Sequence, residues 1–228
     1  MPQHEEDGDE PEALGADAQQ KKRSAAVTQK RILDAAEQEF AMAGFAGARL
    51  REIAIGAQVQ PALIHHYFND KRGLYEAVIR RGIDQMSIAG WKVLEHERDL
   101  EGYLEGFVEI LIGFYESNQA LLAIMRSEAH SGSDIFVAVV REKTSAILDA
   151  VLKMTAELQR RGSVRADLSP REILISGLSL TLYPVVDAPF LQAILPDPEP
   201  KKTAERRKKI VVDAMLRAIR PAKDAATR

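Results

Sequence analysis

The sequence of 228 residues contains no cysteine. This absence excludes a disulfide framework, thiolate zinc sites such as those of zinc fingers, and a cysteine nucleophile, and it is typical of a protein in a reducing cytoplasm. The chain also lacks an apolar run of the roughly 20 residues needed to cross a bilayer. Its start, MPQHEEDGDE, has neither the basic nor the apolar part of a signal peptide. We therefore expect a soluble, cytoplasmic protein with no membrane partner.

Motifs of common catalytic sites are missing as well. The chain has no GxSxG, no Gly-rich phosphate loop, no HExxH and no pair of carboxylates on an obviously apolar helix. His65 and His66 are adjacent and point about 100° apart on a helix, which argues against a shared metal site. These absences predict a protein that is not an enzyme and that has no catalytic residues, no cofactor and no bound metal.

The net charge of −3 is unusual for a nucleic-acid-binding protein, since such domains carry a basic surplus. The charges are unevenly distributed, however. Residues 1–18 hold seven acidic and no basic side chains, residues 19–82 hold eleven basic and six acidic ones, a surplus of +5, and the remainder holds 20 basic and 21 acidic ones. The first part lacks hydrophobic periodicity and contains Pro and Gly, so we expect residues 1–20 to form a disordered acidic tail.

A short basic run at residues 21–23 precedes the first predicted helix. It is either an arm that lies along DNA phosphates or a solvated charge run. The helix itself begins near Ser24 or Thr28, both acceptable N-caps, and ends at Gly44, the residue type that takes a left-handed conformation after a helix C-terminus.

Two short helices joined by a tight turn follow the first helix. Residues 50–57 carry apolar side chains at helical spacing, and Pro61 opens the next helix, where its missing N–H costs nothing. Ile64 and Phe68 are four residues apart and face inward, so the exposed side of this helix carries Ala62, His65, His66 and Tyr67. The pattern predicts a helix-turn-helix, and Asn69 or Asp70 caps the helix after it.

The sequence from residue 100 to 219 is helical throughout, with no strand-like alternation of useful length. It contains five helical segments, and Pro184 is interpreted as a helix stop. The proline-rich residues 184–202 are expected to form an irregular connection before the last helix. With the four helices before residue 100, the prediction is an all-α protein of about nine helices.

The segment TQKRILDAAEQEFAMAGFAGARLREIAIGAQVQPALIHHYFNDKRGLYEAVI resembles the DNA-binding domain of the TetR (tetracycline repressor) family of transcriptional regulators over about residues 25–80. The resemblance rests on the ILDAA…F…GF pattern, on REIA, on VxPALIxxYF and on KxGLY. It implies a three-helix DNA-binding domain with a helix-turn-helix at residues 21–72, then a larger helical ligand-binding and dimerisation domain at residues 73–220. Residues 221–228 are expected to be a disordered tail.

Two positions depart from the family pattern. Gln58 stands where the family usually has the glycine of the turn, and it would cost roughly 1 kcal/mol if the same turn is kept. Arg49 stands before the second helix, where the family often has a Ser or Thr cap, and we expect it to contact a phosphate by charge instead.

The resemblance also implies roles for individual residues. Gln60, Pro61, Ala62 and His65 correspond to the face that enters the major groove, and Tyr67 and Lys71 to phosphate-contacting positions. Lys71 lies at a helix N-terminus, where free N–H groups already favour anions. His66 is either exposed to DNA or a partly buried structural contact. The full set of predicted DNA contacts is Thr28, Arg49, Leu50, Gln60, Pro61, Ala62, His65, His66, Tyr67 and Lys71.

Two further sites are predicted in the helical domain. Candidate ligand contacts are large or polar side chains, although aromatic residues at helical spacing belong to the core in most cases: Trp91, Tyr103, Phe107, Phe114, Met125, His130 and Tyr183. The resemblance implies that the last two helices of each subunit form a four-helix dimer interface, with the candidates Ile173, Gly177, Leu178, Ile210, Val211, Ala214 and Met215.

The expected function is that of a ligand-responsive repressor that binds a palindromic DNA operator as a homodimer and is released by a small molecule. The alternative is a helical small-molecule-binding protein without DNA-binding activity. The sequence leaves open the effector, the target genes, repression against activation, and assembly beyond a dimer.

Overall fold

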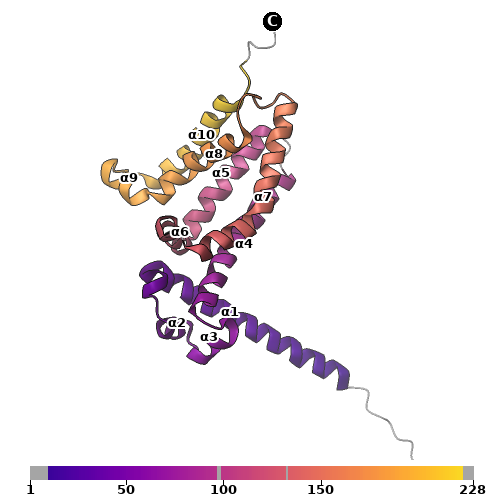
Figure 1. Cartoon of the computed structure of the whole chain (residues 1–228), viewed down its shortest axis with the longest axis vertical. Helices are drawn as coiled ribbons and strands as arrows, with labels where there is room; N and C mark the ends of the chain where they lie inside the picture. The colour runs from indigo at the N-terminus through magenta and orange to yellow at the C-terminus, as the bar shows by residue number, and fades with distance from the viewer. Residues whose placement is uncertain (1–9, 97–98, 132, 223–228) are drawn as a thin grey trace, which may run out of the picture. The chain divides into compact units, whose positions relative to one another are not determined.

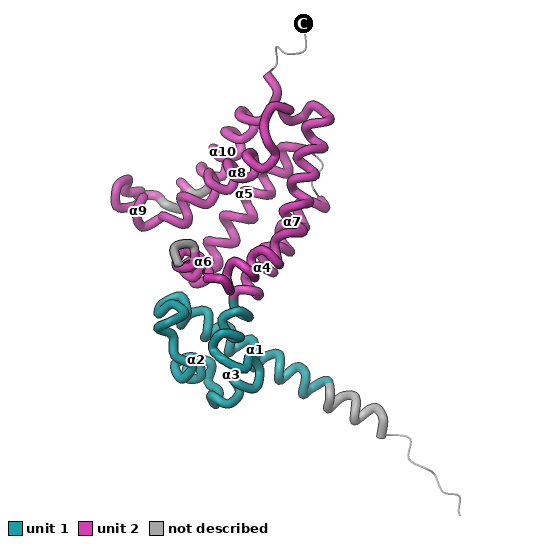
Figure 2. The backbone as a smooth tube through the Cα atoms, viewed as in Figure 1, with its two compact units in different colours: residues 1–78 teal, residues 79–228 magenta. Residues whose placement is uncertain are grey.

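The computed structural model describes residues 10–96, 99–131 and 133–222 of the chain. Within these ranges the protein is built from ten α-helices and contains no strand (Figure 1), which confirms the all-α prediction. The chain divides into two compact units, residues 1–78 and residues 79–228 (Figure 2). The division falls inside a helix at Val78, later in the chain than the expected boundary at residue 72.

Unit 1, residues 1–78, contains α1 (Glu10–Gly47), α2 (Leu50–Ala57), α3 (Pro61–Phe68) and the beginning of α4 (Lys71–His96). Unit 2, residues 79–228, contains the rest of α4 and then α5 (Leu100–Ser117), α6 (Gln119–Ser131), α7 (Asp134–Arg160), α8 (Pro170–Val186), α9 (Ala188–Ile194) and α10 (Pro200–Ile219).

The first helix starts earlier than expected. α1 begins at Glu10, so the prediction of a disordered tail is wrong for residues 10–20, whereas residues 1–9 lie outside the described residues. Residues 10–27 are rich in Ala, Glu, Gln and Lys, and these strong helix formers extend the helix without an apolar stripe. Ser24 and Thr28 are therefore interior residues rather than caps, and the basic residues 21–23 are helical and exposed.

The other end of α1 and the start of α4 follow the sequence signals. Gly44 has φ 66° and ψ 174° and interrupts the helical geometry at the expected residue. Asp70 caps α4, because its Oδ1 accepts the Gly73 N–H at 2.8 Å. Between these points Phe40, Phe45 and Tyr75 pack in the core of unit 1, and the ring of Tyr75 lies 4.8 Å from Phe40 and 4.9 Å from Phe45.

Pro184 does not end its helix, which corrects the expectation of a stop and of an irregular segment from residue 184 to 202. α8 continues to Val186, and the seven-residue α9 follows before α10 begins at Pro200. Pro184 has no N–H for the carbonyl of Leu180. Nη2 of Arg207 in α10 donates to that carbonyl at 3.1 Å instead, so a partner helix satisfies the group that proline leaves open.

The core of unit 2 is formed by α5, α7, α8 and α10. Val108, Leu158, Val211 and Met215 are buried in one hydrophobic cluster of these helices. α5 packs against both α8 and α10, and α8 also packs against α10 and α7. α10 ends at Ile219, and of the expected C-terminal tail, residues 223–228 lie outside the described residues.

Candidate DNA-binding surface and ligand cavity

The turn between α2 and α3 contains a left-handed residue, Gln58, at the position where the TetR family usually has glycine. Gln58 has φ 54° and ψ 48°. Its N–H donates to the carbonyl of Ile55 at 3.0 Å, and the Val59 N–H donates to the carbonyl of Ala54 at 3.0 Å. A non-glycine residue therefore occupies a conformation that favours glycine.

Arg31 of α1 supports this turn. Its Nη2 donates to the backbone carbonyl of Ala57, to the carbonyl of Gln58 at 3.2 Å and to Oε1 of Gln58 at 3.3 Å. These acceptors lie at the C-terminus of α2, where the helix dipole attracts a cation. Sequence reasoning missed Arg31, because it lies 26 and 27 residues before its partners and no local motif joins them.

The second short helix, α3, buries one side and exposes the other as expected. Ile64 is completely buried, whereas the residues predicted to read bases are exposed: Gln60, Pro61, Ala62 and His65. Nδ1 of His65 lies 2.8 Å from the carbonyl oxygen of Asn69. A carbonyl only accepts, so we assign the hydrogen to Nδ1, and Nε2 of the neutral ring is left as an acceptor.

His66 is exposed, and its ring stands edge-on to Tyr67 with the ring centroids 5.0 Å apart. It is therefore not a buried structural residue. Tyr67 is half-buried, which leaves part of its surface available beside the exposed side of α3.

The other predicted DNA contacts have structural partners that the sequence did not indicate. Nζ of Lys71 donates to the carbonyl of Ala46 at 3.0 Å and lies 5.1 Å from the centroid of Phe45. Oγ1 of Thr28 donates to the carbonyl of Ser24 at 2.9 Å, inside α1. Lys71 therefore has a structural role in unit 1 whether or not it meets a phosphate.

The entry to α2 also differs from a capped helix. Arg49 occupies the N-cap position without a side-chain cap, and Oε1 of Glu39 accepts its backbone N–H at 3.1 Å. The Arg49 side chain is exposed, and Leu50 after it is half-buried.

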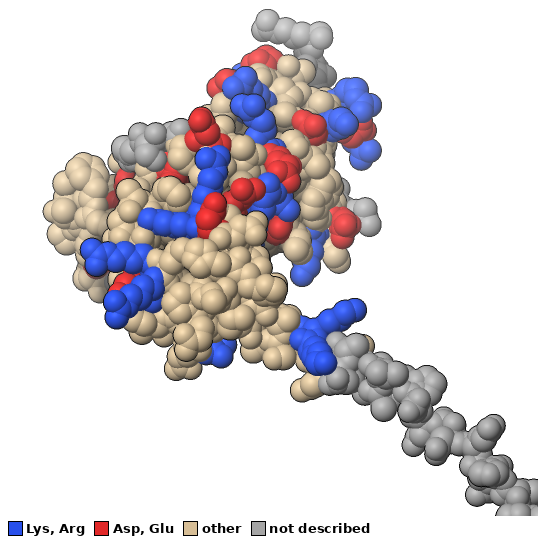
Figure 3. Space-filling model, turned by 60° about the horizontal axis from the view of Figure 1, so that its bottom comes forward, with Lys and Arg blue, Asp and Glu red and all other residues tan. Residues whose placement is uncertain are grey.

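In Figure 3 the lower face is mostly uncharged, and lysine and arginine side chains stand around its edge. Such cations can position DNA phosphates around a face that contacts bases.

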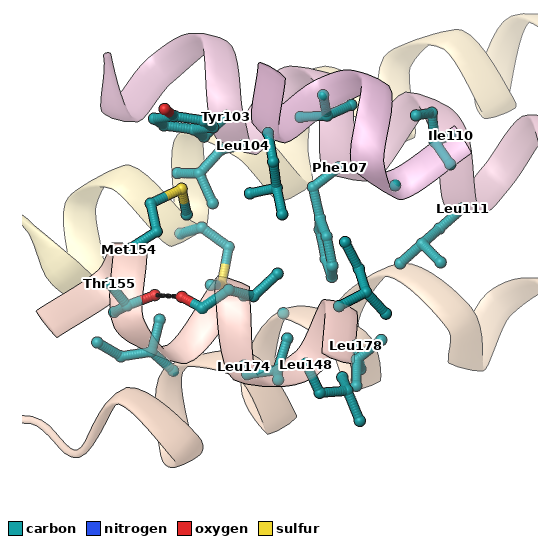
Figure 4. A pocket seen from close by; sticks show the side chains of 18 of the residues that line it. Tyr103, Leu104, Phe107, Ile110, Leu111, Leu148, Met154, Thr155, Leu174 and Leu178 are labelled. Atoms are coloured by element: carbon teal, nitrogen blue, oxygen red, sulfur yellow. Dashed lines mark hydrogen bonds between the residues drawn. The ribbon is translucent and has the colours of Figure 1, made fainter. Parts of the chain in front are cut away.

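Unit 2 contains a partly open cavity of about 260 Å³. Side chains of α5, α7 and α8 extend into the same space, and Leu104, Phe107, Met154, Leu174 and Leu178 are visible around it (Figure 4). α4 contributes Met86, Ser87 and Gly90 to its wall. The cavity is almost entirely apolar, which is typical of a small-molecule site.

Ion pairs join α4 and α7 close to this wall. Arg80 donates to both carboxylate oxygens of Glu142, at 2.7 and 2.8 Å, and Nζ of Lys143 lies 2.9 Å from Oδ1 of Asp84. The hydrogen bond from Arg80 holds the pKa of the Glu142 carboxyl below its ordinary value. Both cations therefore have carboxylate partners outside the cavity.

The structure brings together only part of the predicted ligand contacts. Tyr103 and Phe107 line the cavity. Trp91, Phe114, Met125 and Tyr183 do not line it, and Tyr183 is 49% exposed. His130 belongs to α6, but its side chain lies outside the described residues. The cavity residues that sequence reasoning missed are mostly aliphatic, and their helical spacing resembles that of any core residue.

The predicted dimer contacts need a larger correction. Four of the seven candidates line the cavity of their own unit: Ile173, Gly177, Leu178 and Met215. Val211 is also buried, at 1% exposure. These residues lie on the face of α8 and α10 that packs inside the protomer, and all of them except the half-buried Leu178 are covered by the protomer's own side chains. Ile210, at 58% exposure, and Ala214 are exposed.

The apolar residues that remain exposed on α8 lie on its other sides: Ile175, Leu180 and Tyr183, with exposures of 43%, 38% and 49%. α8 therefore has apolar side chains toward the core and toward solvent. Periodicity alone does not distinguish the inner apolar residues of α8 from the outer ones, so the residues predicted from the sequence on this helix are the inner ones.

No single helix among the described residues is both long enough and apolar enough to cross a membrane, while two bent pairs, α5 with α6 and α8 with α9, meet the length and composition criteria jointly.

An exposed helix-turn-helix in one unit and an apolar cavity in a second, all-helical unit are the features of a helix-turn-helix regulatory protein with a ligand-binding domain. The family model "Bacterial regulatory proteins, tetR family" matches residues 32–78, and the model "Tetracyclin repressor-like, C-terminal domain" matches residues 102–215. The second match alone covers 114 of 228 residues. The chain belongs to the TetR family of bacterial regulatory proteins.

Its relatives carry the same description. The chain is 30% identical over 103 residues to the HTH-type transcriptional repressor SCO4008 of Streptomyces coelicolor, a match that spans 45% of this chain and 50% of that protein. It is 25% identical over 175 residues to the HTH-type transcriptional regulator RutR of Escherichia coli K12, which spans 76% of this chain and 82% of RutR.

Solved structures share the fold. A TetR-family regulator from Mesorhizobium loti superposes with a TM-score of 0.65 at 22% identity, covering 86% of this chain and 98% of that one. The fatty acid degradation regulator FadR from Bacillus halodurans gives a TM-score of 0.67 at 18% identity, covering 82% and 97%.

Proposed function

We propose that this protein is a transcriptional repressor that binds a palindromic operator as a homodimer and leaves it when a small molecule enters the cavity of unit 2. The observation that supports this most directly is the exposed side of α3, a helix that is anchored in the core by the buried Ile64. The next helix, α4, contributes residues to the wall of the cavity.

His65 is the side chain that we expect to read sequence. Its Nε2 is an acceptor in the neutral ring, because Nδ1 donates to the Asn69 carbonyl at 2.8 Å. In the major groove such an acceptor pairs with the amino group of adenine or cytosine. Arg49 is exposed at the start of α2, and its guanidinium is suited to a phosphate, a contact that carries affinity without sequence information.

Release by a ligand requires that the ligand prefer one conformation over another. α4 is continuous from Lys71, directly after the helix-turn-helix, to His96, and Met86, Ser87 and Gly90 on it line the cavity. A molecule that fills the cavity therefore contacts the helix that begins in unit 1. We propose that the occupied state favours a half-site spacing that does not fit the operator.

A selection of genomic DNA fragments by the purified protein tests the DNA-binding part. We expect enrichment of a palindromic sequence, with an affinity that falls steeply as salt rises. His65→Ala is expected to alter the preferred base at one position of each half-site. His96→Ala is the matched control, since His96 is also exposed and its Nδ1 also lies near a backbone carbonyl, that of Lys92 at 2.7 Å.

Failure to select any fragment at low salt would contradict the proposal. It would favour the alternative of a helical small-molecule-binding protein without DNA affinity. An unchanged sequence preference in the His65 variant, with the operator still bound, would overturn only the role of that residue.

A further inference from the structure

We infer that the cavity of unit 2 binds an uncharged, largely apolar molecule of about ten carbon atoms and rejects carboxylates and phosphates of the same size. This inference names the ligand class for the proposed repressor and rests on that proposed function only where the ligand is called its effector.

The composition of the wall is the first observation. None of the 27 lining residues is acidic, basic, a histidine or a side-chain amide. Burial of an ionised group without a partner is strongly unfavourable, because the interior solvates charge poorly. A carboxylate or phosphate in this cavity would find no cation among the lining residues that the structure describes.

The few polar groups of the wall are hydroxyls, and most of their hydrogens already have acceptors. Thr144 donates to the carbonyl of Val140 at 2.8 Å, and Thr155 donates to that of Val151 at 2.9 Å. Figure 4 shows the second of these bonds at the cavity edge. Ser87 donates to the carbonyl of Lys143 at 3.3 Å. The oxygen atoms of these hydroxyls can still accept a hydrogen bond from a ligand. Their hydrogens are already donated to backbone carbonyls, so they do not stabilise an anion.

The two tyrosines complete the set. The Tyr115 hydroxyl lies 3.6 Å from Sδ of Met86, a weak acceptor. Burial raises the pKa of Tyr115 to about 12, as expected of a wall that disfavours negative charge. Among the described residues the Tyr103 hydroxyl has no hydrogen-bond partner, so it can serve one polar group of a ligand.

Cations near the cavity do not change this conclusion. Lys143 precedes Thr144 on α7, but its ammonium group pairs with Asp84. Arg80 on α4 pairs with Glu142. Because both have carboxylate partners, an incoming anion would have to compete with an existing ion pair and leave the cavity lining to reach them.

The volume limits the size of the ligand. An apolar cavity of roughly 150 Å³ holds benzene. A cavity of about 260 Å³ therefore accommodates roughly ten carbon atoms, the size of a bicyclic ring or a medium-length chain. The apolar wall and this size together favour compounds such as small terpenoid or aromatic alcohols over polar metabolites.

Direct binding to the full-length protein, without DNA, tests the ligand class. The probes are two pairs matched in size, 2-naphthol with 2-naphthoate and decan-1-ol with decanoate, measured by displacement of an apolar fluorescent dye at pH 7. We expect the alcohol of each pair to bind at least about 100-fold more tightly than the carboxylate. Equal or tighter binding of the carboxylates would overturn the inference, and so would binding of neither class.

A variant locates the site. Leu174→Trp places a larger side chain in the cavity wall and is expected to weaken alcohol binding at least about tenfold. Val137→Trp is the control, because Val137 lies on α7, is 46% exposed and does not line the cavity. If circular dichroism shows that the Leu174 variant is misfolded, Leu104→Phe on α5 provides the same test. Unchanged binding in a folded cavity variant would overturn the site.

Operator release is measured separately. An alcohol that binds in the cavity but leaves operator affinity unchanged would contradict the effector role while the ligand class stands. If the cavity preferred carboxylates while the protein bound its operator normally, the ligand class would be contradicted and the proposed DNA-binding function would stand.

Discussion

Gln58 has φ 54°, a left-handed conformation that costs a non-glycine residue about 1 kcal/mol. Arg31 donates to the carbonyl of Ala57, to the carbonyl of Gln58 and to the side-chain Oε1 of Gln58. The sequence alone showed the cost of this residue but not the group that offsets it. The left-handed conformation of Gln58 is therefore supported by the side chain of Arg31, which lies 27 residues earlier in the sequence.

Arg31→Ala is expected to lower the free energy of unfolding by about 1–2 kcal/mol, because the C-terminal carbonyls of α2 lose a charged donor. The loss should be smaller when Gln58 is also changed to Gly, since one of the bonded groups is then absent. Urea denaturation of the four proteins of this cycle measures both effects. Lys30→Ala, which removes only an exposed pair with Asp34, is the control and should change stability by no more than about 0.5 kcal/mol.

Tyr115 gives a second residue-scale prediction, concerning pH. Burial raises its pKa to about 12, whereas the unfolded chain has the ordinary value of 10.0. The neutral form is thus favoured in the folded state. The contribution of the protonated Tyr115 to the free energy of unfolding is complete below pH 10. It is lost as pH rises from 10 to 12, which lowers the free energy of unfolding by about 2–3 kcal/mol in total.

Thermal unfolding of the wild type and of Tyr115→Phe between pH 9 and 12 measures this contribution. The difference in stability between the two proteins should stay constant below pH 10 and shift in favour of the Phe variant above it. A constant difference over the whole range would show that the phenol ionises as freely in the folded protein as in the unfolded one.

The elements differ in how well local sequence defines them. The helix-turn-helix has a proline at the start of α3, apolar residues at fixed spacing and Asp70 as the cap of α4, and all three signals lie within a few residues of the structure they specify. α8 lacks such a signal for its orientation, because Ile173 faces the core and Ile175 faces solvent in the same apolar stretch. The cavity likewise depends on which sides of five helices, α4, α5, α7, α8 and α10, meet, and that is a tertiary property.

The contact between α8 and α10 leads to a prediction at this scale. Arg207 donates to the Leu180 carbonyl that Pro184 leaves without its helical partner. Arg207→Ala should therefore lower stability by about 1 kcal/mol. The effect is kept small because the buried Nε of Arg207 has no hydrogen-bond partner among the described atoms, and the substitution removes that cost too.

Pro184→Ala restores an N–H opposite Leu180, so the Arg207 substitution should cost less in that background. Guanidinium denaturation of both single variants and the double variant measures the coupling. Arg206→Ala, at the exposed neighbouring position, should leave stability nearly unchanged. Identical costs of Arg207→Ala in the two backgrounds would mean that the carbonyl is satisfied in another way.

At the scale of the whole molecule, the proposed operator site requires two copies of α3, and one chain supplies one. The exposed apolar residues of α8 and α10, Ile175, Leu180, Tyr183 and Ile210, are the surface that we propose for the second subunit. Ile210 is one of the contacts predicted from the sequence, whereas Ile175, Leu180 and Tyr183 replace predicted residues that lie inside the protomer. Because α8 and α10 pack on each other within the protomer, two such pairs can form a four-helix contact.

Ile210→Glu places a charge on this surface and is expected to convert the dimer to a monomer in sedimentation at micromolar concentration. Operator affinity should fall at least about 100-fold, because each monomer then binds a single half-site without the second one tethered beside it. Ile88→Glu is the matched control: Ile88 on α4 is also 58% exposed, and this variant should remain dimeric and bind the operator normally. A dimeric Ile210 variant would place the subunit contact elsewhere, whereas a monomer with full operator affinity would contradict the requirement for two recognition helices.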